Sequence, residues 1–293
     1  MTVLVMSAHG NQGRLLLPKL AQAGLKVRAL RGAGPPEELL ALGATQAVVG
    51  DAADPKVLEQ ALVGVRTVYH VGPSAHPNER AMGMAMVDAA RNAGVEHLVF
   101  SSVLHPILSE MTHHALKRDI EEKLISSGLN FTILQPADYM QVISYRNTFE
   151  TGVYGRWWSF ARREELVDLD DVTDVALKVI REGAVHYGAT YPLCSGDCLD
   201  GNQIADTVAQ VMGRTIERLE TSAEDFLQAF FGAAGDDPAA AYTLNVLRGL
   251  NAWYGKHDFV GNANVLTMLL GRKPNSFETM VRREFAAWQA ATR

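Results

Sequence analysis

Residues 3–24 read VLVMSAHGNQGRLLLPKLAQAG, and this stretch decides the fold. A short apolar run at residues 3–6 passes into a glycine-containing turn, and a helical pattern over residues 14–23 ends at Gly24. A second apolar run follows at residues 27–30. Strand, glycine turn, helix and strand within roughly thirty residues is the pattern of a dinucleotide-binding βαβ unit. The stretch therefore predicts such a unit at the start of a parallel sheet.

The turn carries small residues at a regular spacing. Ser7, Gly10 and Gly13 fit a G-x-x-G-x-x-G pattern in which serine takes the first place. Glycine lets the backbone turn tightly and approach a phosphate, and the helix N-terminus beyond it offers unpaired N–H groups. We expect the loop to hold the diphosphate of a dinucleotide; the alternative is an ordinary tight turn without a ligand. The expected contacts come from Ser7, His9, Gly10, Asn11, Gln12 and Gly13.

Apolar runs and helical patterns alternate through the first half of the chain. Further strands are expected at residues 47–49, 67–71, 97–101 and 131–134, and further helices at residues 37–42, 55–62, 78–93 and 113–127. Together with the first two, these make six strands that alternate with helices. Such alternation predicts an α/β protein with a doubly wound parallel Rossmann sheet covered on both faces.

The pattern changes in the second half. Residues 142–166 look irregular, helices are expected at residues 171–182 and 200–212, and a strand is expected at residues 190–193. From residue 223 onward the pattern is mainly helical. We expect a Rossmann domain at residues 1–141 and a smaller helix-rich substrate-binding cap at residues 142–293, with sheet strands that can be shared.

Composition narrows the class of protein. The chain has 293 residues, is 47% hydrophobic and 20% charged, and carries a net charge of -6, which is ordinary for a globular protein. No long basic run is present, which argues against a nucleic-acid binder. No stretch of about 20 apolar residues is free of charge, so no membrane span is expected. The chain begins directly with a strand pattern, which leaves no room for a signal peptide and predicts a cytoplasmic protein.

Cysteine and metal-ligand spacing predict no metal site. Cys194 and Cys198 supply only two thiols, whereas a structural zinc ion needs about four ligands. A disulfide between them is conceivable, but a reduced pair is the expectation because nothing suggests export. No set of histidines and acids shows metal-ligand spacing.

The end of the second strand indicates which nicotinamide cofactor would bind. A carboxylate there binds the adenosine ribose of NAD, whereas an arginine accommodates the extra phosphate of NADP. Here Arg31 ends the strand and no acid occurs before Glu37. We therefore expect NADP(H), with Arg31 at its phosphate; Arg28 points to the other face of the strand and is a weaker candidate. The alternative for Arg31 is an exposed arginine on a loop.

Three stretches of the chain resemble a known family when they are taken together. They are Gly10–Gly13, residues 101–125 with SSVLHP, HHALK, EE and LI, and residues 131–141 with FTILQPADYMQ; residues 168–176, 213–214 and 276–278 also fit. As a set they resemble the NmrA-like family of atypical short-chain dehydrogenase/reductases over nearly the whole chain. The resemblance implies a Rossmann domain that binds a nicotinamide dinucleotide and a small C-terminal substrate domain.

The resemblance also implies a catalytic helix. Typical short-chain dehydrogenases carry Tyr-x-x-x-Lys there, and this spacing puts both side chains on one face. Lys117 matches the lysine that would bind the nicotinamide ribose, but His113 stands at the tyrosine position. A histidine can serve as the acid because imidazole titrates near neutral pH; Tyr139 and His114 are the other candidates. The alternatives are a helix-start residue for His113 and a solvated surface lysine for Lys117.

Further site residues follow the ends of the strands. A hydroxyl near Ser102 steadies the substrate carbonyl in related dehydrogenases, and Asp51 resembles the family's adenine-edge residue. Gly72-Pro73 would leave space for the cofactor, and Pro136 ends the sixth strand within a stretch that carries the resemblance. The alternatives are a routine loop residue for Ser102, a helix cap for Asp51 and a plain turn for Gly72-Pro73.

Two functions remain open. The first is an NADPH-dependent oxidoreductase that reduces a small organic substrate (carbonyl, quinone, imine or activated double bond) by hydride transfer, and the second is an NADP-binding redox sensor without turnover. Lys117 favours the enzyme, and the missing tyrosine favours the sensor. The aromatic residues of RWWSF (156–160) and of Tyr242, Trp253 and Tyr254 could line a flat substrate pocket or simply pack in the core. A homodimer is one of the oligomeric states that the sequence allows.

Overall fold

The computed structural model describes residues 1–142, 145–234 and 236–292, which form two compact units. The first unit holds Met1–Leu108, His114–Pro136 and Leu169–Tyr191, and the second holds Ser109–His113, Ala137–Asp168 and Pro192–Arg293. Residues 169–191 thus belong to the first unit although they follow part of the second unit in the sequence.

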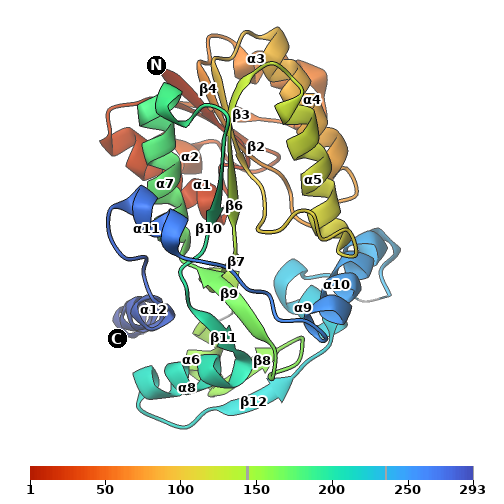
Figure 1. Cartoon of the computed structure of the whole chain (residues 1–293), viewed down its shortest axis with the longest axis vertical. Coiled ribbons are helices and arrows are strands. Elements are labelled where there is room, and N and C mark those ends of the chain that lie inside the picture. The colour runs from red at the N-terminus through yellow and green to blue at the C-terminus, as the bar shows by residue number, and fades with distance from the viewer. Residues whose placement is uncertain (143–144, 235, 293) are drawn as a thin grey trace. The chain divides into compact units, whose positions relative to one another are not determined.

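A seven-stranded sheet with the order β10-β6-β5-β4-β1-β2-β3 forms the centre of the first unit (Figure 1). The strands are β1 (Thr2–Val5), β2 (Lys26–Arg31), β3 (Gln46–Val49), β4 (Thr67–Val71), β5 (His97–Ser101), β6 (Asn130–Pro136) and β10 (Ala189–Leu193). Neighbouring pairs among β1 to β6 are all parallel. The six predicted strands of the first half are therefore present, and the parallel Rossmann sheet is confirmed.

Helices cover both faces of the sheet, as parallel strands require. They are α1 (Asn11–Gln22), α2 (Glu37–Ala41), α3 (Pro55–Leu62), α4 (Glu79–Asn92), α5 (Thr112–Ile125) and α7 (Leu169–Glu182), followed by the short η2 (Gly183–His186). In Figure 1, α1 and α7 lie on one face, and α3, α4 and α5 lie on the other. Lys19 of α1 joins the first pair, with its Nζ 2.7 Å from an Asp170 oxygen and 2.6 Å from an Asp174 oxygen.

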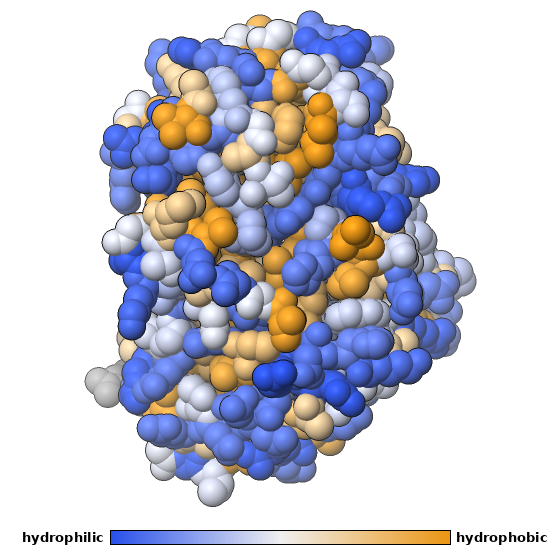
Figure 2. Space-filling view, in the orientation of Figure 1, coloured by the Kyte–Doolittle hydropathy of each residue, from blue (hydrophilic) through white to orange (hydrophobic). Residues whose placement is uncertain are grey.

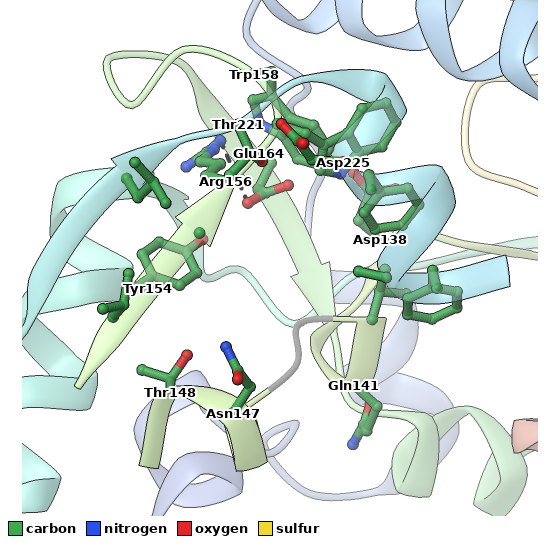
Figure 3. Close-up of a pocket in the computed structure, with 18 of the residues that line it drawn as sticks. Asp138, Gln141, Asn147, Thr148, Tyr154, Arg156, Trp158, Glu164, Thr221 and Asp225 are labelled. Carbon is green, nitrogen blue, oxygen red and sulfur yellow. Dashed lines mark ion pairs between the residues drawn. The ribbon is translucent and has the colours of Figure 1, made fainter. Parts of the chain in front are cut away.

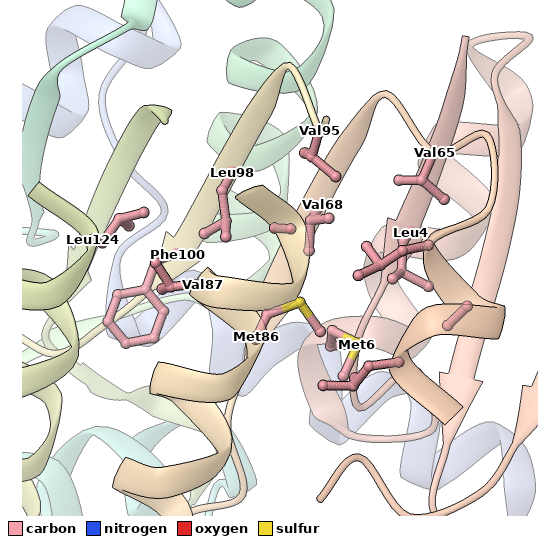
Figure 4. Packing of buried hydrophobic residues seen from close by; sticks show 14 of the residues in the cluster. Leu4, Met6, Val65, Val68, Met86, Val87, Val95, Leu98, Phe100 and Leu124 are labelled. Carbon is pink, nitrogen blue, oxygen red and sulfur yellow. The ribbon is translucent and has the colours of Figure 1, made fainter. Parts of the chain in front are cut away.

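The face of the sheet under α3, α4 and α5 holds a continuous hydrophobic core (Figure 4). Alternate residues of the strands, such as Leu4, Val68 and Leu98, meet Met86 and Val87 of α4 there. All five are at most 1% exposed, so each contributes about 1.5–3 kcal/mol of burial free energy. This packing fixes the positions of α4 and α5, on which the candidate catalytic residues depend.

The second unit contains two small sheets and several helices. Its elements are β7 (Asp138–Tyr139), η1 (Met140–Val142), α6 (Tyr145–Thr151), β8 (Val153–Arg156), β9 (Arg163–Val167), β11 (Cys198–Asp200), α8 (Gly201–Met212), β12 (Glu217–Glu220), α9 (Ala223–Phe231), η3 (Pro238–Ala240), α10 (Ala241–Tyr254), α11 (Asn264–Leu270) and α12 (Phe277–Ala291). The sheets have the orders β11-β9-β7 and β12-β8. The expectation of an irregular segment at residues 142–166 was wrong, although residues 143 and 144 lie outside the described ones. The strands there are short and pair with distant segments, which no local pattern reveals.

A buried carboxylate ties the end of β9 to the C-terminal helix of the second unit. Asp168 is 0% exposed and accepts hydrogen bonds from both terminal nitrogens of Arg283, at 3.0 and 3.1 Å. The amides of Asn275 and Gln141 donate to it as well, at 3.0 and 2.6 Å. A buried charge needs this many donors to offset its lost hydration.

Polar and charged side chains cover most of the face drawn in Figure 2, where the hydrophobic ones form small separate patches. Among the residues that the structure describes, no helix is both long and apolar enough to cross a membrane. Both cysteines are free thiols.

We predict that Arg283→Met lowers the free energy of unfolding by about 2–3 kcal/mol, because Asp168 loses two charge-assisted hydrogen bonds while it stays buried. Arg282→Met is the matched control on the same helix. It should cost less than about 0.5 kcal/mol, because the Arg282–Glu278 pair is exposed. Urea unfolding measures both values, and equal losses would contradict a structural role for the Asp168 contacts.

Candidate functional site

The loop between β1 and α1 has the backbone that its sequence pattern predicts. Ser7, at the first position of the pattern, has a φ of +47°, in the left-handed region where glycine is the usual residue. Its hydroxyl donates to the carbonyl of Val71 at 2.8 Å, and its carbonyl accepts from Gly10 N–H at 2.9 Å. A Cβ on Gly13 would lie 2.4 Å from the Ala8 carbonyl oxygen, so only glycine fits there.

The N-terminus of α1 suits an anion. Its N-cap residue is Gly10, no side chain caps it, and its first turn carries no acid. Asn11 is exposed, whereas Gln12 is buried and accepts a hydrogen bond from the Tyr69 hydroxyl. A helix end with open N–H groups and a positive dipole fits the diphosphate of a dinucleotide, so the residues present suit such a cofactor.

Arg31 lies at the end of β2 and is only 7% exposed, so the alternative of an exposed loop arginine is wrong. Its guanidinium donates to the carbonyls of Ala33 and Pro35 at 2.6 and 2.9 Å, and to the Glu38 carboxylate at 2.8 Å. This pairing lowers the pKa of Glu38. A phosphate at Arg31 would therefore compete with a carboxylate of the chain itself.

Two other basic residues, Arg28 and Arg14, make different contacts. Arg28 donates to Gln46 and to the carbonyls of Ala61 and Val63, which ties β2 to β3 and the end of α3. Arg14 donates to the carbonyl of His9 at 2.7 Å, beside the glycine loop. Burial and the nearby guanidinium groups of Arg31 and Arg14 lower the pKa of His9, so His9 is neutral at neutral pH. The loop side of the sheet thus presents Arg14 and Arg31 as its cationic groups.

The remaining predicted cofactor residues lie at the carboxyl ends of strands. Asp51 is exposed and closes a turn by accepting from Ala53 N–H at 2.8 Å; Asp54, not Asp51, caps α3. Gly72 is buried, and Pro136 is buried at the end of β6. A Cβ on Gly72 would meet only Glu79, at 3.6 Å or more, so the chain itself does not require glycine there. Pro73 is half-buried beside it.

Lys117 is buried and paired. Its Nζ lies 2.8 Å from Oε1 of Glu79, and the two side chains are 6% and 0% exposed, so the alternative of a solvated surface lysine is wrong. Glu79 begins α4 beneath Gly72. His70 of β4 stacks on Phe100, and burial, with Lys117 nearby, lowers its pKa to about 4. The ion pair therefore lies at the strand end where a cofactor is expected, beside a neutral histidine.

Ser102 is 4% exposed and lies near the same ion pair. Burial raises the pKa of Glu121 on α5, while the Ser102 hydroxyl and the Gln135 amide oppose that shift, and Lys117 opposes it more weakly. Gln135 donates to Glu121 at 3.0 Å. The first unit thus brings Lys117, Glu79, Ser102 and Glu121 together as one polar cluster.

The three candidate proton donors, His113, His114 and Tyr139, differ in burial and in the unit to which they belong. His113 is half-buried in the first turn of α5, and His114 is buried with its Nδ1 3.1 Å from the His105 carbonyl oxygen. Tyr139 belongs to β7 of the second unit. His113 and Tyr139 both belong to the second unit, whereas His114 and Lys117 belong to the first. All three candidates for the acid therefore stay predictions.

A pocket of about 570 Å³ opens within the second unit (Figure 3). Tyr139 is one of its lining residues. Trp157 and Trp158 also line the pocket, and their ring centroids are 4.7 Å apart in an edge-on arrangement. Trp157 stacks on Phe226 at 4.5 Å, and Trp158 stacks on Tyr254 at 5.0 Å. Trp157 and Trp158 therefore both pack against other rings and line the pocket, whereas Tyr242, Trp253 and Tyr254 are not among its lining residues.

Sequence reasoning missed Glu79, Glu121 and Glu164. An acid in the first turn of a helix, as at Glu79, is usually there for the helix dipole. Glu121 and Glu164 occur in charged runs that read as solvated faces. The one usable signal was the spacing of Glu121, four residues after Lys117 on the same helix face.

We predict that Gly13→Ala abolishes measurable dinucleotide binding, because its Cβ would displace the backbone at Ala8. Gly10→Ala, whose Cβ would lie 3.2 Å from the Ser7 carbonyl oxygen, should weaken binding far less. Calorimetric titration with NADPH measures both, and circular dichroism checks that both variants fold. Retained affinity in folded Gly13→Ala would remove the loop from the site.

Comparisons with known proteins show the family and the fold of the chain. An NAD(P)H azoreductase of Xenophilus azovorans is 26% identical over 295 residues, covering 99% of this chain and 100% of that protein. An NADPH-dependent quinone oxidoreductase of Escherichia coli, solved with NADPH, has a TM-score of 0.76 at 20% identity and covers 97% of this chain and 99% of its own. NmrA, a negative transcriptional regulator solved with NADP, has a TM-score of 0.79 at 17% identity and covers 99% and 97%. The model of the NmrA-like family matches residues 1–260, and the chain belongs to that family.

Proposed function

We propose that the protein is an NADPH-dependent reductase of a small organic acceptor, with a quinone or an azo compound as the substrate class to test first. The buried Lys117–Glu79 pair is the observation that carries this proposal. A glycine loop and an arginine would be enough to hold a cofactor. A buried lysine at the nicotinamide end of the sheet is costly to maintain and suits chemistry rather than binding alone.

The reaction balances with groups that the chain supplies. NADPH provides a hydride, that is, two electrons and a proton, and one further proton completes the reduction of a quinone to a hydroquinone. Gly10, Gly13 and the N-terminus of α1 would hold the diphosphate, and Arg31 would hold the extra phosphate. Lys117, positioned by its ion pair with Glu79, would donate to the ribose hydroxyls. His113, His114 and Tyr139 are the candidates for the proton donor.

The names of two relatives support this proposal, since one is called an azoreductase and another a quinone oxidoreductase. The second is 24% identical over 296 residues. The second candidate function is a cofactor sensor. His113 at the position where typical reductases have tyrosine favours it, as does the likeness to the regulator NmrA.

Steady-state oxidation of NADPH with menadione and with a water-soluble azo dye separates the two functions. A reductase consumes NADPH in proportion to enzyme and acceptor. Tight NADPH binding without turnover on any acceptor would favour the sensor instead.

Cofactor preference should depend on Arg31 and Glu38. Arg31→Ala should weaken NADPH binding by about 1–3 kcal/mol and leave NADH binding unchanged, because it removes charge-assisted hydrogen bonds to the extra phosphate. Glu38→Gln should tighten NADPH binding, because the phosphate no longer competes with a carboxylate for Arg31. Calorimetric titration with both cofactors gives the two affinities. An unchanged NADPH-to-NADH ratio in Arg31→Ala would refute the assignment.

Catalysis should depend on Lys117, but a single replacement would leave Glu79 buried without its partner and destabilise the fold. The double variant Lys117→Met/Glu79→Gln removes both charges together. It should stay folded and lose turnover by roughly 10²-fold. Lys123→Met, on the same helix with an exposed pair to Asp88, is the control and should keep the wild-type rate. Wild-type turnover in the folded double variant would discard Lys117 as a catalytic residue.

A further inference from the structure

The pocket of the second unit has the size and walls of a small-molecule site. Its volume of about 570 Å³ lies within the range of about 300–1,000 Å³ that ligand pockets occupy. Trp157, Trp158 and Phe226 give it aromatic walls whose mutual stacking restrains them. Leu219 and Phe230 are part of the lining as well. Rigid aromatic surfaces of this kind favour a flat ligand.

Hydrogen-bond donors line the pocket without a partner in the described chain. Arg156 is 3% exposed, and its Nη2 donates to the Arg162 carbonyl at 3.0 Å and lies 3.4 Å from a Glu164 oxygen. Its Nε and Nη1, and Nε1 of Trp158, have no acceptor at ordinary hydrogen-bond geometry among the described residues, although the Tyr154 hydroxyl lies close enough to Arg156 for its own pKa to be affected. Nη1 lies against Gly201, where a Cβ would come within 2.5 Å, which leaves Nε and the indole N–H for a ligand. A buried N–H without an acceptor costs about 1–3 kcal/mol.

Two carboxyl groups lie beside these donors. Glu164 of β9 is 3% exposed, and in Figure 3 it lies across the space from Asn147 and Thr148 of α6. Burial raises the pKa of Glu164 to about 8, against the lowering effect of Arg156 and with the help of Asp138. Burial also raises the pKa of Asp138, to which Tyr254 donates a hydrogen bond. At neutral pH Glu164 is therefore mostly protonated and can itself donate.

The charged and titratable groups around Glu164 come from several elements. They are Asp138, Tyr145, Tyr154, Arg156, Cys198 and Tyr254. Arg156 is the single permanent cation among them, and because Glu164 keeps its proton at neutral pH, Asp138 supplies the negative charge that balances it. A ligand anion would add negative charge beside both carboxyls, and a ligand cation would lie beside Arg156. The balance therefore favours an uncharged ligand that accepts hydrogen bonds.

We propose that this pocket binds a flat, uncharged aromatic dicarbonyl compound, a quinone, with one carbonyl oxygen accepting from the carboxyl group of Glu164 and from N–H groups of Arg156 or Trp158. The role of that quinone as the substrate rests on the reductase function proposed above. Binding itself does not, because every residue that carries it belongs to the second unit.

The test is equilibrium binding of menadione without NADPH, followed by quenching of tryptophan fluorescence. Glu164→Leu, which keeps the volume but removes the donor, should weaken binding by tenfold or more. Glu164→Gln, which keeps an N–H donor, should bind at neutral pH like the wild type. Glu165→Gln is the matched control, because Glu165 is the next residue of β9, does not line the pocket and accepts from Gly196 N–H at 2.7 Å. Its affinity should be unchanged.

The pH dependence supplies a second readout that does not rely on the leucine variant folding. Wild-type affinity should fall as the pH rises through about 8, because ionised Glu164 can no longer donate and repels a carbonyl oxygen. Glu164→Gln should bind independently of pH over that range. Equal affinity in Glu164→Leu, or the same alkaline fall in Glu164→Gln, would overturn the proposal.

The same variants distinguish failure of the pocket from failure of the reductase. If menadione binding depends on Glu164 but NADPH is not consumed, the pocket is a quinone-binding site and the proposed reductase function is wrong. If the protein consumes NADPH with menadione but the Glu164 variants bind menadione as tightly as the wild type, the reductase function stands and the pocket is not the quinone site.

Discussion

The ion pair between Lys117 and Glu79 is the constraint on which the candidate site of the first unit depends. Both side chains are almost fully excluded from water, and each would carry a desolvation penalty of several kcal/mol if it were alone. The pair therefore requires α4 and α5 to keep their separation. The hydrophobic core beneath these two helices does so, because its side chains interdigitate and resist movement. The packed apolar core thus fixes the distance between α4 and α5, which the Lys117–Glu79 ion pair alone could not do.

The Rossmann half could be predicted because its physics is local. In the sequence, residues 3–24 show an apolar strand, a glycine-containing turn and a helix, and the structure has the same elements in the same order. Ser7, at the first position of the turn pattern, adopts a positive φ that usually favours glycine. The spacing of His113 and Lys117 likewise follows from the helix period alone. The identity of the partner of Lys117 does not, because it comes from a different helix and depends on how α4 packs beside α5.

The second unit resisted prediction for the opposite reason. β12 has the sequence ERLE and all four of its residues are exposed, so neither hydrophobicity nor alternation marks it as a strand. It exists because it pairs with β8, more than sixty residues earlier in the chain. Glu164 has the same origin, since the run RREE reads as surface until β9 is enclosed by β7 and β11. Tertiary pairing decides both cases, and a single sequence does not display it.

The Lys117–Glu79 and Arg156–Glu164 pairs both bury charged groups, but they differ in how completely their contacts offset the lost hydration. Lys117 and Glu79 meet at 2.8 Å, as an ion pair must if it is to offset its lost hydration. Arg156 and Glu164 meet only at 3.4 Å, and burial raises the pKa of the Glu164 carboxyl group. Among the described residues, Nε and Nη1 of Arg156 have no acceptor at ordinary hydrogen-bond geometry. Hydrophobic residues of similar volume would cost less in both places if stability alone were at stake. An incompletely paired cluster that faces an open, aromatic-walled space is instead the preorganised half of a binding site, because its unmet hydrogen bonds become favourable only when a ligand with matching acceptors arrives.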